Sequence, residues 1–600
     1  MLSDTETCAL VGKNGSVDWL GFPRVDSGAC FAALLGGPEH GRWQIAPEGR
    51  VLSVKRQYRE GTLILETEFT TAEGVVRLID FMPPRGAKPD LIRIVEGVSG
   101  RVPMGMEYVV RFDYGSQVPW VRKVGDSLEA IAGPNALSLR TPVALRGENM
   151  KTVASFAVAR GDRVPFVLTW HPSHEPPARF VHAEHALRDT VAWWTAWTAR
   201  CQYDGGPYRE PVLVSLRVLK GLTYAPTGGI AAAATTSLPE WIGSTRNWDY
   251  RYCWLRDATF TLLALLRSGY HDEATAWRDW LLRSVAGDVS QLQTMYGVAG
   301  ERRLTEWQVP WLPGYERSAP VRVGNAAVEQ LQLDVYGEVM DAMFQSRCCS
   351  GPAEDLAWPV EKKLLDFLES NWRDADEGIW EVRGPRRAFT HSKVMCWVAF
   401  DRAVRSVEMF GLDGPVERWR LRREEVHRDI CEKAFDPELG AFTQSYGSCE
   451  LDASLLLLPH VGFLPATDPR MLGTVHAIER TLMPQGLVQR YTSKPDPALG
   501  QAMDGLPAGE GAFLACSFWL ADNYALTGRR KDALALFEHL LSLRNDVGLL
   551  AEEYDPVGRR QLGNFPQAFS HVALVNTALD LERESPGRKP GSRGPEDVTP

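Results

Sequence analysis

The sequence predicts a multidomain β + α protein, in which an N-terminal antiparallel β-sandwich is followed by an (α/α)6 barrel. Three observations lead to this prediction. Apolar and polar residues alternate with a period of two as far as about residue 184, and a helical period takes over from residue 211 to residue 583. Short turns and long loops then alternate between the helical segments, which is the pattern of helical hairpins arranged in a ring.

The strands come first, as short runs separated by turn residues. Residues 62–69 and 75–81 flank an Ala-Glu-Gly turn, which is the pattern of a β-hairpin. The other predicted strands are 43–47, 91–97, 106–112, 136–140, 152–159 and 166–170. We therefore expect a sandwich over residues 1–184 and a linking helix within residues 185–210.

Twelve helical segments follow, enough for six hairpins and a closed ring. They are 211–223, 257–268, 272–284, 325–345, 358–372, 391–410, 415–434, 450–458, 468–481, 511–526, 530–543 and 568–582. The long connections are 285–324, 373–390, 482–510 and 544–567. These loops should gather on one face of the barrel domain, residues 211–583, where functional residues usually lie. The Pro-, Gly- and Arg-rich tail, residues 584–600, is predicted to be disordered.

Composition and charge exclude several classes of protein. With 44% hydrophobic and 24% charged residues, the chain of 600 residues is neither collagen-like nor disordered. Its net charge of −10 offers no basic field, so we expect no nucleic acid and no anionic membrane as partner. The start of the chain lacks the features of a signal peptide, and no run approaches a membrane span.

The cysteine pattern agrees with a cytoplasmic location. Ten cysteines are scattered along the chain without a Cys-x-x-Cys pair, so we interpret them as reduced, mostly buried thiols. No ligand spacing for zinc is present, and we predict no metal site. The 20 tryptophans suit either a thick core or a site that binds the flat apolar faces of sugar rings.

The first chemically informative loop is residues 246–257, Arg-Asn-Trp-Asp-Tyr-Arg-Tyr-Cys-Trp-Leu-Arg-Asp. Four aromatic residues alternate there with two Asp and three Arg. A helix cap would explain Asp257 alone, but it leaves the interleaving of rings and charges unexplained. A sugar needs both an aromatic surface for its C–H face and charged groups for its hydroxyls, so we predict carbohydrate binding.

Two further loops offer carboxylates. Glu381 follows Trp380, and an aromatic wall raises a carboxyl pKa by desolvating the charged form, as a general acid requires. The alternative for Glu381 is a surface ion pair with Arg383. Glu552 and Glu553 form an adjacent pair, for which a solvated acidic edge is the alternative. Another candidate carboxylate is Glu510, for which a role at the start of a helix is equally acceptable.

These motifs resemble those of glycoside hydrolase family 15, the glucoamylase and trehalase family, and in particular its bacterial members with a trehalase-like N-terminal domain. The resemblance covers nearly the whole chain. Its motifs are residues 9–20, 22–27, 247–257, 378–381, 391–397, 552–556 and 563–571. The family has a β-sandwich on an (α/α)6 barrel, as the periodicity predicts.

The resemblance implies an inverting mechanism with Glu381 as general acid and Glu552 as general base. It also implies a set of substrate-binding residues, which are Tyr250, Trp254, Arg256, Asp257, Tyr315 and Trp380. Of these, Arg256 and Asp257 would bind the hydroxyls of the non-reducing glucose, and Tyr250 would help to hold the water. Tyr315 stands where fungal members use a tryptophan.

The resemblance further implies an exo-acting hydrolase that releases β-D-glucose from short α-glucosides. We favour trehalose as substrate, with α-1,4 or α-1,6 malto- and isomalto-oligosaccharides as the alternative. No cofactor is required by this chemistry, while dependence on phosphate or magnesium and formation of a homo-oligomer stay open.

Two other classes of protein remain as alternatives. A phosphorylase would have a phosphate pocket in place of Glu552, and a non-catalytic glucan-binding protein would have lost one of the two glutamates.

Overall fold

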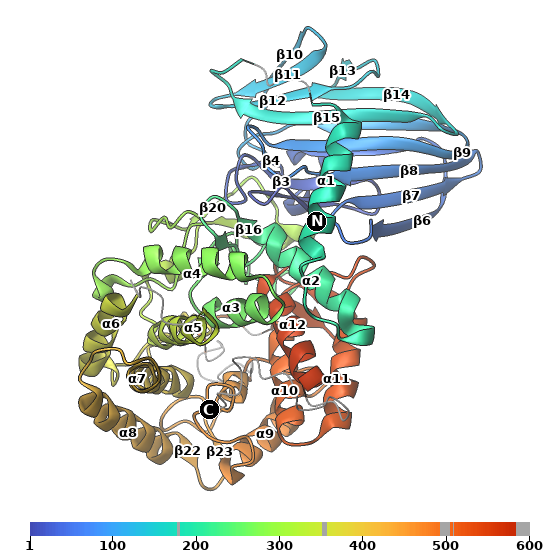
Figure 1. Ribbon diagram of the computed structural model, residues 1–600. Helices are drawn as coiled ribbons and strands as arrows, with labels where there is room; N and C mark the ends of the chain where they lie inside the picture. Colours follow the sequence, from blue (N-terminus) through green and yellow to red (C-terminus); the bar gives the residue numbers. More distant parts are fainter. Residues whose placement is uncertain (177–180, 351–356, 493–503, 508, 584–600) are drawn as a thin grey trace.

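The computed structural model describes residues 1–176, 181–350, 357–492, 504–507 and 509–583, so the predicted tail from residue 584 lies outside the described residues. An antiparallel β-rich domain comes first and a helical domain follows, as expected (Figure 1). No described helix has the length and apolarity to cross a membrane. All ten cysteines are free thiols.

One long strand, β9, organises the N-terminal domain (Figure 1). One half of it pairs with β8 and β15, and the other half pairs with β5 and β14. The bounds of these strands are β5 (Arg42–Pro47), β8 (Gly74–Phe81), β9 (Asp90–Val109), β14 (Lys151–Ala159) and β15 (Arg163–Pro172). The sequence predicted two strands here, but Gly100, with φ +69°, bends the chain from one sheet to the other without reversing it.

Shorter strands extend the two sheets on either side of β9. They are β1 (Leu2–Ser3), β2 (Cys8–Val11), β3 (Ser16–Gly21), β4 (Ala29–Phe31), β6 (Val51–Tyr58), β7 (Leu65–Thr71), β10 (Trp120–Val124), β11 (Ser127–Ala132), β12 (Asn135–Arg140) and β13 (Arg146–Glu148). A separate apolar core fills the space between the sheets. The helix α1 (Ala183–Thr198) leads out of this domain.

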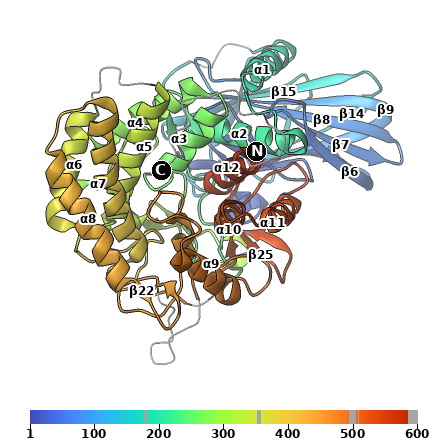
Figure 2. The ribbon, with the colours of Figure 1, turned by 60° about the horizontal axis from the view of Figure 1, so that its bottom comes forward.

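The helical domain is a ring of helices, with the N-terminal domain to one side (Figures 1 and 2). Its helices are α2 (Arg209–Leu222), α3 (Ala258–Arg267), α4 (His271–Val285), α5 (Asp334–Ser350), α6 (Trp358–Asn371), α7 (Thr390–Phe410), α8 (Val416–Lys433), α9 (Pro469–Leu482), α10 (Leu514–Leu526), α11 (Arg530–Ser542) and α12 (Ala568–Arg583), together with the 3-10 helix η7 (Ala453–Leu457). The ring closes where α12 packs against α2 and α3.

An inner and an outer layer differ in burial. The inner elements α3, α5, α7, η7, α10 and α12 pack on one another around the ring. Almost every residue of α10 is buried, whereas α8, in the outer layer, buries only Trp419, Val426 and Ile430. A helix that is apolar all round has to lie inside, and one with a single apolar stripe has to lie outside.

Two predicted helices differ from the structure. Residues 450–458 form only the short 3-10 helix η7, which begins where the Asp452 side chain accepts a hydrogen bond from the Ser454 backbone and is followed by Pro459. Proline has no N–H and cannot extend an α-helix from there. The helix predicted from residue 325 begins at Asp334, because Asn325 caps a separate 3-10 turn first.

The connections that enter the inner elements are long, and described residues from four of them line one pocket. They are 223–257, 286–333, 372–389, 434–452, 483–513 and 543–567. The connections that leave the inner elements are shorter, as at Gly269 and Gly411. The three motif loops of the sequence therefore lie together on one face.

Candidate active site

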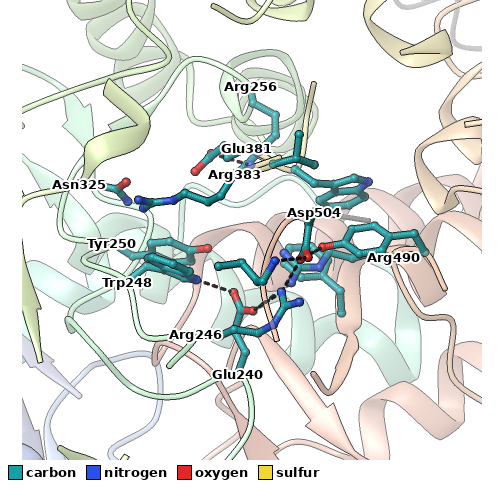
Figure 3. A pocket seen from close by; sticks show the side chains of 15 residues that line it. Glu240, Arg246, Trp248, Tyr250, Arg256, Asn325, Glu381, Arg383, Arg490 and Asp504 are labelled. Atoms are coloured by element: carbon teal, nitrogen blue, oxygen red, sulfur yellow. Dashed lines mark hydrogen bonds and ion pairs between the residues drawn. The ribbon is translucent and has the colours of Figure 1, made fainter. Parts of the chain in front are cut away.

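A pocket opens among these loops, and four of them line it (Figure 3). Its lining residues are Glu240, Arg246, Trp248, Tyr250, Arg256, Asn325, Trp380, Glu381, Val382, Arg383, Arg490, Tyr491, Asp504, Leu506 and Phe513. Four of the predicted site residues are among them, namely Tyr250, Arg256, Trp380 and Glu381. The structure thus brings together residues that are more than 120 positions apart in the sequence.

Glu381 points into the pocket from the loop between α6 and α7. Its Oε1 accepts a hydrogen bond from Trp254 Nε1 at 2.5 Å and lies 3.3 Å from an Arg256 guanidinium nitrogen. Burial raises the pKa of this carboxyl, and the charge of Arg256 opposes the shift only in part. The residue has φ +58°, a strained conformation that occurs most often at functional sites. The alternative of a surface ion pair with Arg383 is wrong, because Arg383 pairs with Glu306 and Glu381 contacts Trp254 and Arg256 instead.

Aromatic rings wall this side of the pocket. Trp380 Nε1 donates to both carboxylate oxygens of Asp452, at 2.9 and 3.1 Å, and its ring packs edge-on against Phe513. The Tyr250 ring packs edge-on against Trp254, with 5.1 Å between the centroids. Each indole or phenol is therefore fixed by a neighbour and presents a rigid apolar surface.

Arg256 and Asp257 form a buried pair beside Glu381. Arg256 Nε donates to Asp257 Oδ1 at 2.8 Å, and a second guanidinium nitrogen donates to the Ile379 carbonyl at 3.1 Å. Asp257 precedes α3, but its side chain makes no capping hydrogen bond. The helix-cap alternative for Asp257 is therefore wrong. The carboxylate of Asp257 accepts a hydrogen bond from Arg256 instead.

Glu552 and Glu553 are fully buried, so the solvated acidic edge is excluded. Glu552 Oε2 accepts a hydrogen bond from the Asn564 backbone at 3.3 Å, and the nearby Tyr250 hydroxyl lowers the pKa of the same carboxyl. Burial, with the negative charge of Glu240 second, raises the pKa of Glu552 to about 8. Glu552 is not among the residues that line the pocket. It lies behind the lining residue Tyr250.

Tyr315 lies apart from this group. It belongs to a 3-10 turn, Tyr315–Arg317, and lines a second cavity together with Arg560 and Phe565. Its hydroxyl accepts a 3.4 Å hydrogen bond from Arg560, in the hairpin that follows Glu552. The structure thus places Tyr315 on the other side of that hairpin from Glu381.

The sequence did not select the charged residues that line the remainder of the pocket. Arg490 lies 3.1 Å from Glu240 and 2.7 Å from Glu510, and Arg246 lies 2.7 Å from Asp504. All five are buried. Arg246 opens the first informative loop, and Glu510 is a candidate carboxylate in the sequence. Glu240, Arg490 and Asp504 belong to none of the motifs, although an aromatic residue directly follows both Glu240 and Arg490.

Three of the carboxylates have the spacing of metal ligands. Oxygen atoms of Glu240, Glu510 and Glu553 lie within 4.8 Å of one another. One nitrogen of Arg490, Nη2, is 3.1 Å from Glu240, 2.7 Å from Glu510 and 3.5 Å from Glu553. The guanidinium therefore already supplies the positive charge that a cation would bring to this group.

These features define the class of protein. A buried carboxyl with raised pKa, rigid aromatic walls, charged groups for hydroxyls and a second buried glutamate are the parts of a glycoside hydrolase site. The chain belongs to the glycosyl hydrolases family 15, whose model matches residues 206–579, and residues 1–191 match the trehalase-like N-terminal model. The predicted family is thereby confirmed.

Relatives are similar over nearly the whole chain. A trehalase of Mycobacterium tuberculosis is 38% identical, with 97% of this chain and 89% of the relative covered. A trehalase of Thermoplasma volcanium is 33% identical, with 97% and 92% covered. Among solved structures, a bacterial glucoamylase complexed with acarbose superposes with a TM-score of 0.71 at 14% identity, covering 97% of this chain and 94% of that one. This last likeness concerns the fold.

Proposed function

We propose that this protein is an inverting, exo-acting α-glucoside hydrolase that favours trehalose and releases β-D-glucose from the non-reducing end. The observation that carries the proposal is Glu381, a buried carboxyl held by Trp254 and Arg256 at the wall of a pocket. The full-length similarity to trehalases from two distant organisms supports trehalose as substrate.

We further propose that the helical domain is an (α/α)6 barrel. Each of the six inner elements packs against an outer helix that adjoins it in the sequence or, for α12, closes the ring. The pairs are α3 with α4, α5 with α6, α7 with α8, η7 with α9, α10 with α11, and α12 with α2. Six such pairs are the plan of that barrel, with η7 as a shortened member.

In the proposed mechanism, Glu381 gives its proton to the oxygen between the two sugars, and the bond from this oxygen to the anomeric carbon breaks. Glu552, as a carboxylate, takes a proton from a water molecule that attacks the same carbon from the opposite face. Inversion requires the two carboxyl groups to be about 6.5–9.5 Å apart. The influence of Tyr250 on the pKa of Glu552 and the place of Tyr250 in the pocket lining support its role beside the attacking water.

The other proposed roles concern substrate binding. The Arg256–Asp257 pair offers both donors and an acceptor to the hydroxyls of the non-reducing glucose. Trp254 and Trp380 supply flat surfaces for its C–H face. Two carboxyl groups suffice for this hydrolysis, so we propose that no cofactor is required. Because Tyr315 lines the neighbouring cavity, its proposed contact with substrate depends on a longer ligand than a disaccharide.

A substrate panel tests the proposal. Purified protein is offered trehalose, maltose, isomaltose and maltotriose, each with and without phosphate and magnesium, and glucose and glucose 1-phosphate are measured. We expect free glucose from trehalose first. In a proton NMR time course, inversion at one ring gives β-glucose, while the leaving glucose keeps its α configuration, so the two anomers should appear in equal initial amounts. Initial release of α-glucose alone would refute inversion, and glucose 1-phosphate would indicate a phosphorylase instead.

Two amide variants test the catalytic pair. Glu381→Gln and Glu552→Gln keep the shape of the side chain but remove the proton donor and the base, so each should lower kcat by at least about 100-fold. Glucose binding, measured by calorimetry, should remain. A variant that turns over trehalose at the wild-type rate would remove that residue from the mechanism.

A further inference from the structure

The side chain of Arg246 is buried, and one of its three guanidinium nitrogens makes no hydrogen bond to the described residues. Its Nε donates to the Pro507 carbonyl at 3.1 Å, and its Nη1 lies 2.7 Å from Asp504 and 3.2 Å from Glu510. Its Nη2 is buried and has no hydrogen-bond partner among the described residues. The residue is only 1% exposed, yet it lines the pocket.

A charged hydrogen-bond donor that is buried without a partner in the free protein indicates that a bound molecule supplies the acceptor. A buried donor of a charged group that is left unsatisfied destabilises the protein, because the group has lost its hydration without gaining a partner. In Arg490, by contrast, a single nitrogen already contacts three carboxylates. A hydroxyl group of a bound molecule would satisfy Nη2 of Arg246, since a hydroxyl accepts from guanidinium and donates to carboxylate.

Two carboxylates lie beside the other terminal nitrogen of this guanidinium, Nη1. Glu240 is 3.7 Å from Arg246 and also receives a hydrogen bond from Trp248 at 3.0 Å, and Asp504 also receives one from Tyr491 at 2.7 Å. All of these residues line the same pocket. Figure 3 shows Glu240 and Arg246 at the opposite side of the pocket from Arg256 and Glu381.

The position of Glu240, Arg246 and Asp504 relative to Glu381 indicates which of the two sugars of the substrate they would contact. In the proposed function, on which this inference rests, the non-reducing glucose binds at Arg256 and the bond is broken at Glu381. The sugar that leaves must then extend from Glu381 away from Arg256. Glu240, Arg246 and Asp504 lie on that side, together with Arg490, whose guanidinium is already paired with Glu240.

We infer that Arg246, flanked by Glu240 and Asp504, binds hydroxyl groups of the leaving sugar and thereby selects free disaccharides as substrates. Arg246 is then a specificity-determining residue for a second, unsubstituted pyranose ring. A site built to hydrogen-bond a hydroxyl discriminates strongly against a ligand that lacks it, because the buried polar groups are left unpaired. A chain with further sugars attached to the second ring would have to displace these charges.

The test compares two substrates that share the same non-reducing glucose. Trehalose has a leaving sugar, whereas α-D-glucosyl fluoride has only fluoride in its place. Arg246→Met should lower kcat/KM for trehalose by about 30- to 300-fold and change kcat/KM for the fluoride by less than about threefold. The ratio of the two values is the readout, since a general loss of active protein cancels from it.

A matched control is Arg402→Met. Arg402 is also buried in a cluster with two carboxylates, Asp341 and Asp401, but it lies on α7 and does not line the pocket. For Arg402→Met, the ratio of kcat/KM for trehalose to kcat/KM for the fluoride should equal that of the wild type. If Arg246→Met does not fold, Arg246→Lys keeps the charge and loses Nη2. Calorimetry of trehalose binding, with and without Arg246→Lys in a Glu381→Gln background, then gives the same comparison without turnover.

The outcomes separate the two proposals. Wild-type protein that hydrolyses neither trehalose nor the fluoride overturns the proposed function. Wild-type protein that hydrolyses both, with an Arg246→Met variant that lowers both equally or neither, overturns the role of Arg246 and leaves the proposed function standing. A wild-type rate on maltotriose as high as that on trehalose overturns the selection of disaccharides.

Discussion

At the scale of single residues, Glu552 has to be charged to act as a base although its surroundings favour the neutral form. Burial and the nearby charge of Glu240 raise its pKa to about 8 from an ordinary value of 4.5. The kcat/KM for trehalose should therefore rise with pH through the neutral range with a midpoint near pH 8, until Glu381 loses the proton that it has to donate. Glu240→Gln removes the second cause and should move this rise to lower pH, as initial rates between pH 5 and 9 would reveal.

The same shift predicts how folding stability depends on pH. An acid whose pKa is higher in the folded state stabilises the fold while it is protonated, fully below about pH 4.5, and this contribution disappears as the pH rises through about 8. Glu552→Gln stays neutral throughout. Relative to wild type, the variant should therefore gain several kcal/mol in free energy of unfolding between pH 5 and pH 9.

Denaturant titrations of both proteins at the two pH values measure this difference. Groups that both proteins share cancel from the comparison. A difference between variant and wild type that does not change with pH would show that Glu552 titrates in its ordinary range, and the rise in rate would then need another source.

At the scale of elements, the hairpin of β25 (Glu553–Asp555) and β26 (Arg560–Leu562) fixes the place of Glu552. Gly563 follows β26 with φ +74°, and a Cβ atom there would lie 2.5 Å from Glu552 Oε2. Gly563→Ala should therefore displace the carboxylate and lower kcat for trehalose at least tenfold, with a stability cost of about 1–2 kcal/mol from the left-handed backbone alone.

Gly528 provides the matched control. It lies in the turn between α10 and α11 with φ +78°, and a Cβ atom there meets nothing within 4 Å. Gly528→Ala should have a similar backbone cost in thermal unfolding and leave kcat unchanged. Equal kcat values for the two variants would mean that the hairpin does not hold Glu552 in its working position.

At the scale of the whole molecule, the two domains meet through the first motif. Arg251 is fully buried and donates to both carboxylate oxygens of Asp249, at 2.8 and 2.7 Å. It also donates to the Tyr114 hydroxyl at 2.8 Å and to the Ser27 carbonyl at 3.0 Å, both in the N-terminal domain. The N-terminal domain thus holds the loop that carries Tyr250 and Trp254.

Breaking this contact should cost both stability and activity. Arg251→Met leaves the Asp249 carboxylate buried without its partner, which should lower the free energy of unfolding by about 3–5 kcal/mol. Tyr114→Phe removes one hydrogen bond only and should cost about 1–3 kcal/mol. Thermal unfolding and kcat for trehalose measure both effects. A stable and fully active Arg251→Met variant would mean that the domains do not depend on each other.

Much of the fold follows from local pattern. Period-two and helical segments predict the β-rich domain, the helical domain and most of its helices, because the spacing of apolar residues along the chain sets which faces can be buried. The exceptions are η7, where Pro459 ends the helix early, and β9, where a glycine bends one strand instead of separating two.

The residues of the candidate active site could likewise be predicted only in part. Glu381 beside Trp380, and the aromatic and charged residues around Arg256, could be predicted because they stand in motifs of consecutive residues. The contact between Glu381 and Trp254, 127 positions apart, needed the tertiary structure. Glu240 and Asp504 could not be predicted, because they come from loops more than 200 residues apart.

The sequence by itself therefore determined the order of the two domains, the family and the carboxyl group proposed as acid. Only the tertiary structure decided that Glu240, Arg246 and Asp504 share one pocket, that Glu552 lies behind Tyr250 and that Tyr315 faces another cavity. The physical reason is that closure of the ring, and not any local pattern, sets which loops meet and which charges have to be buried together.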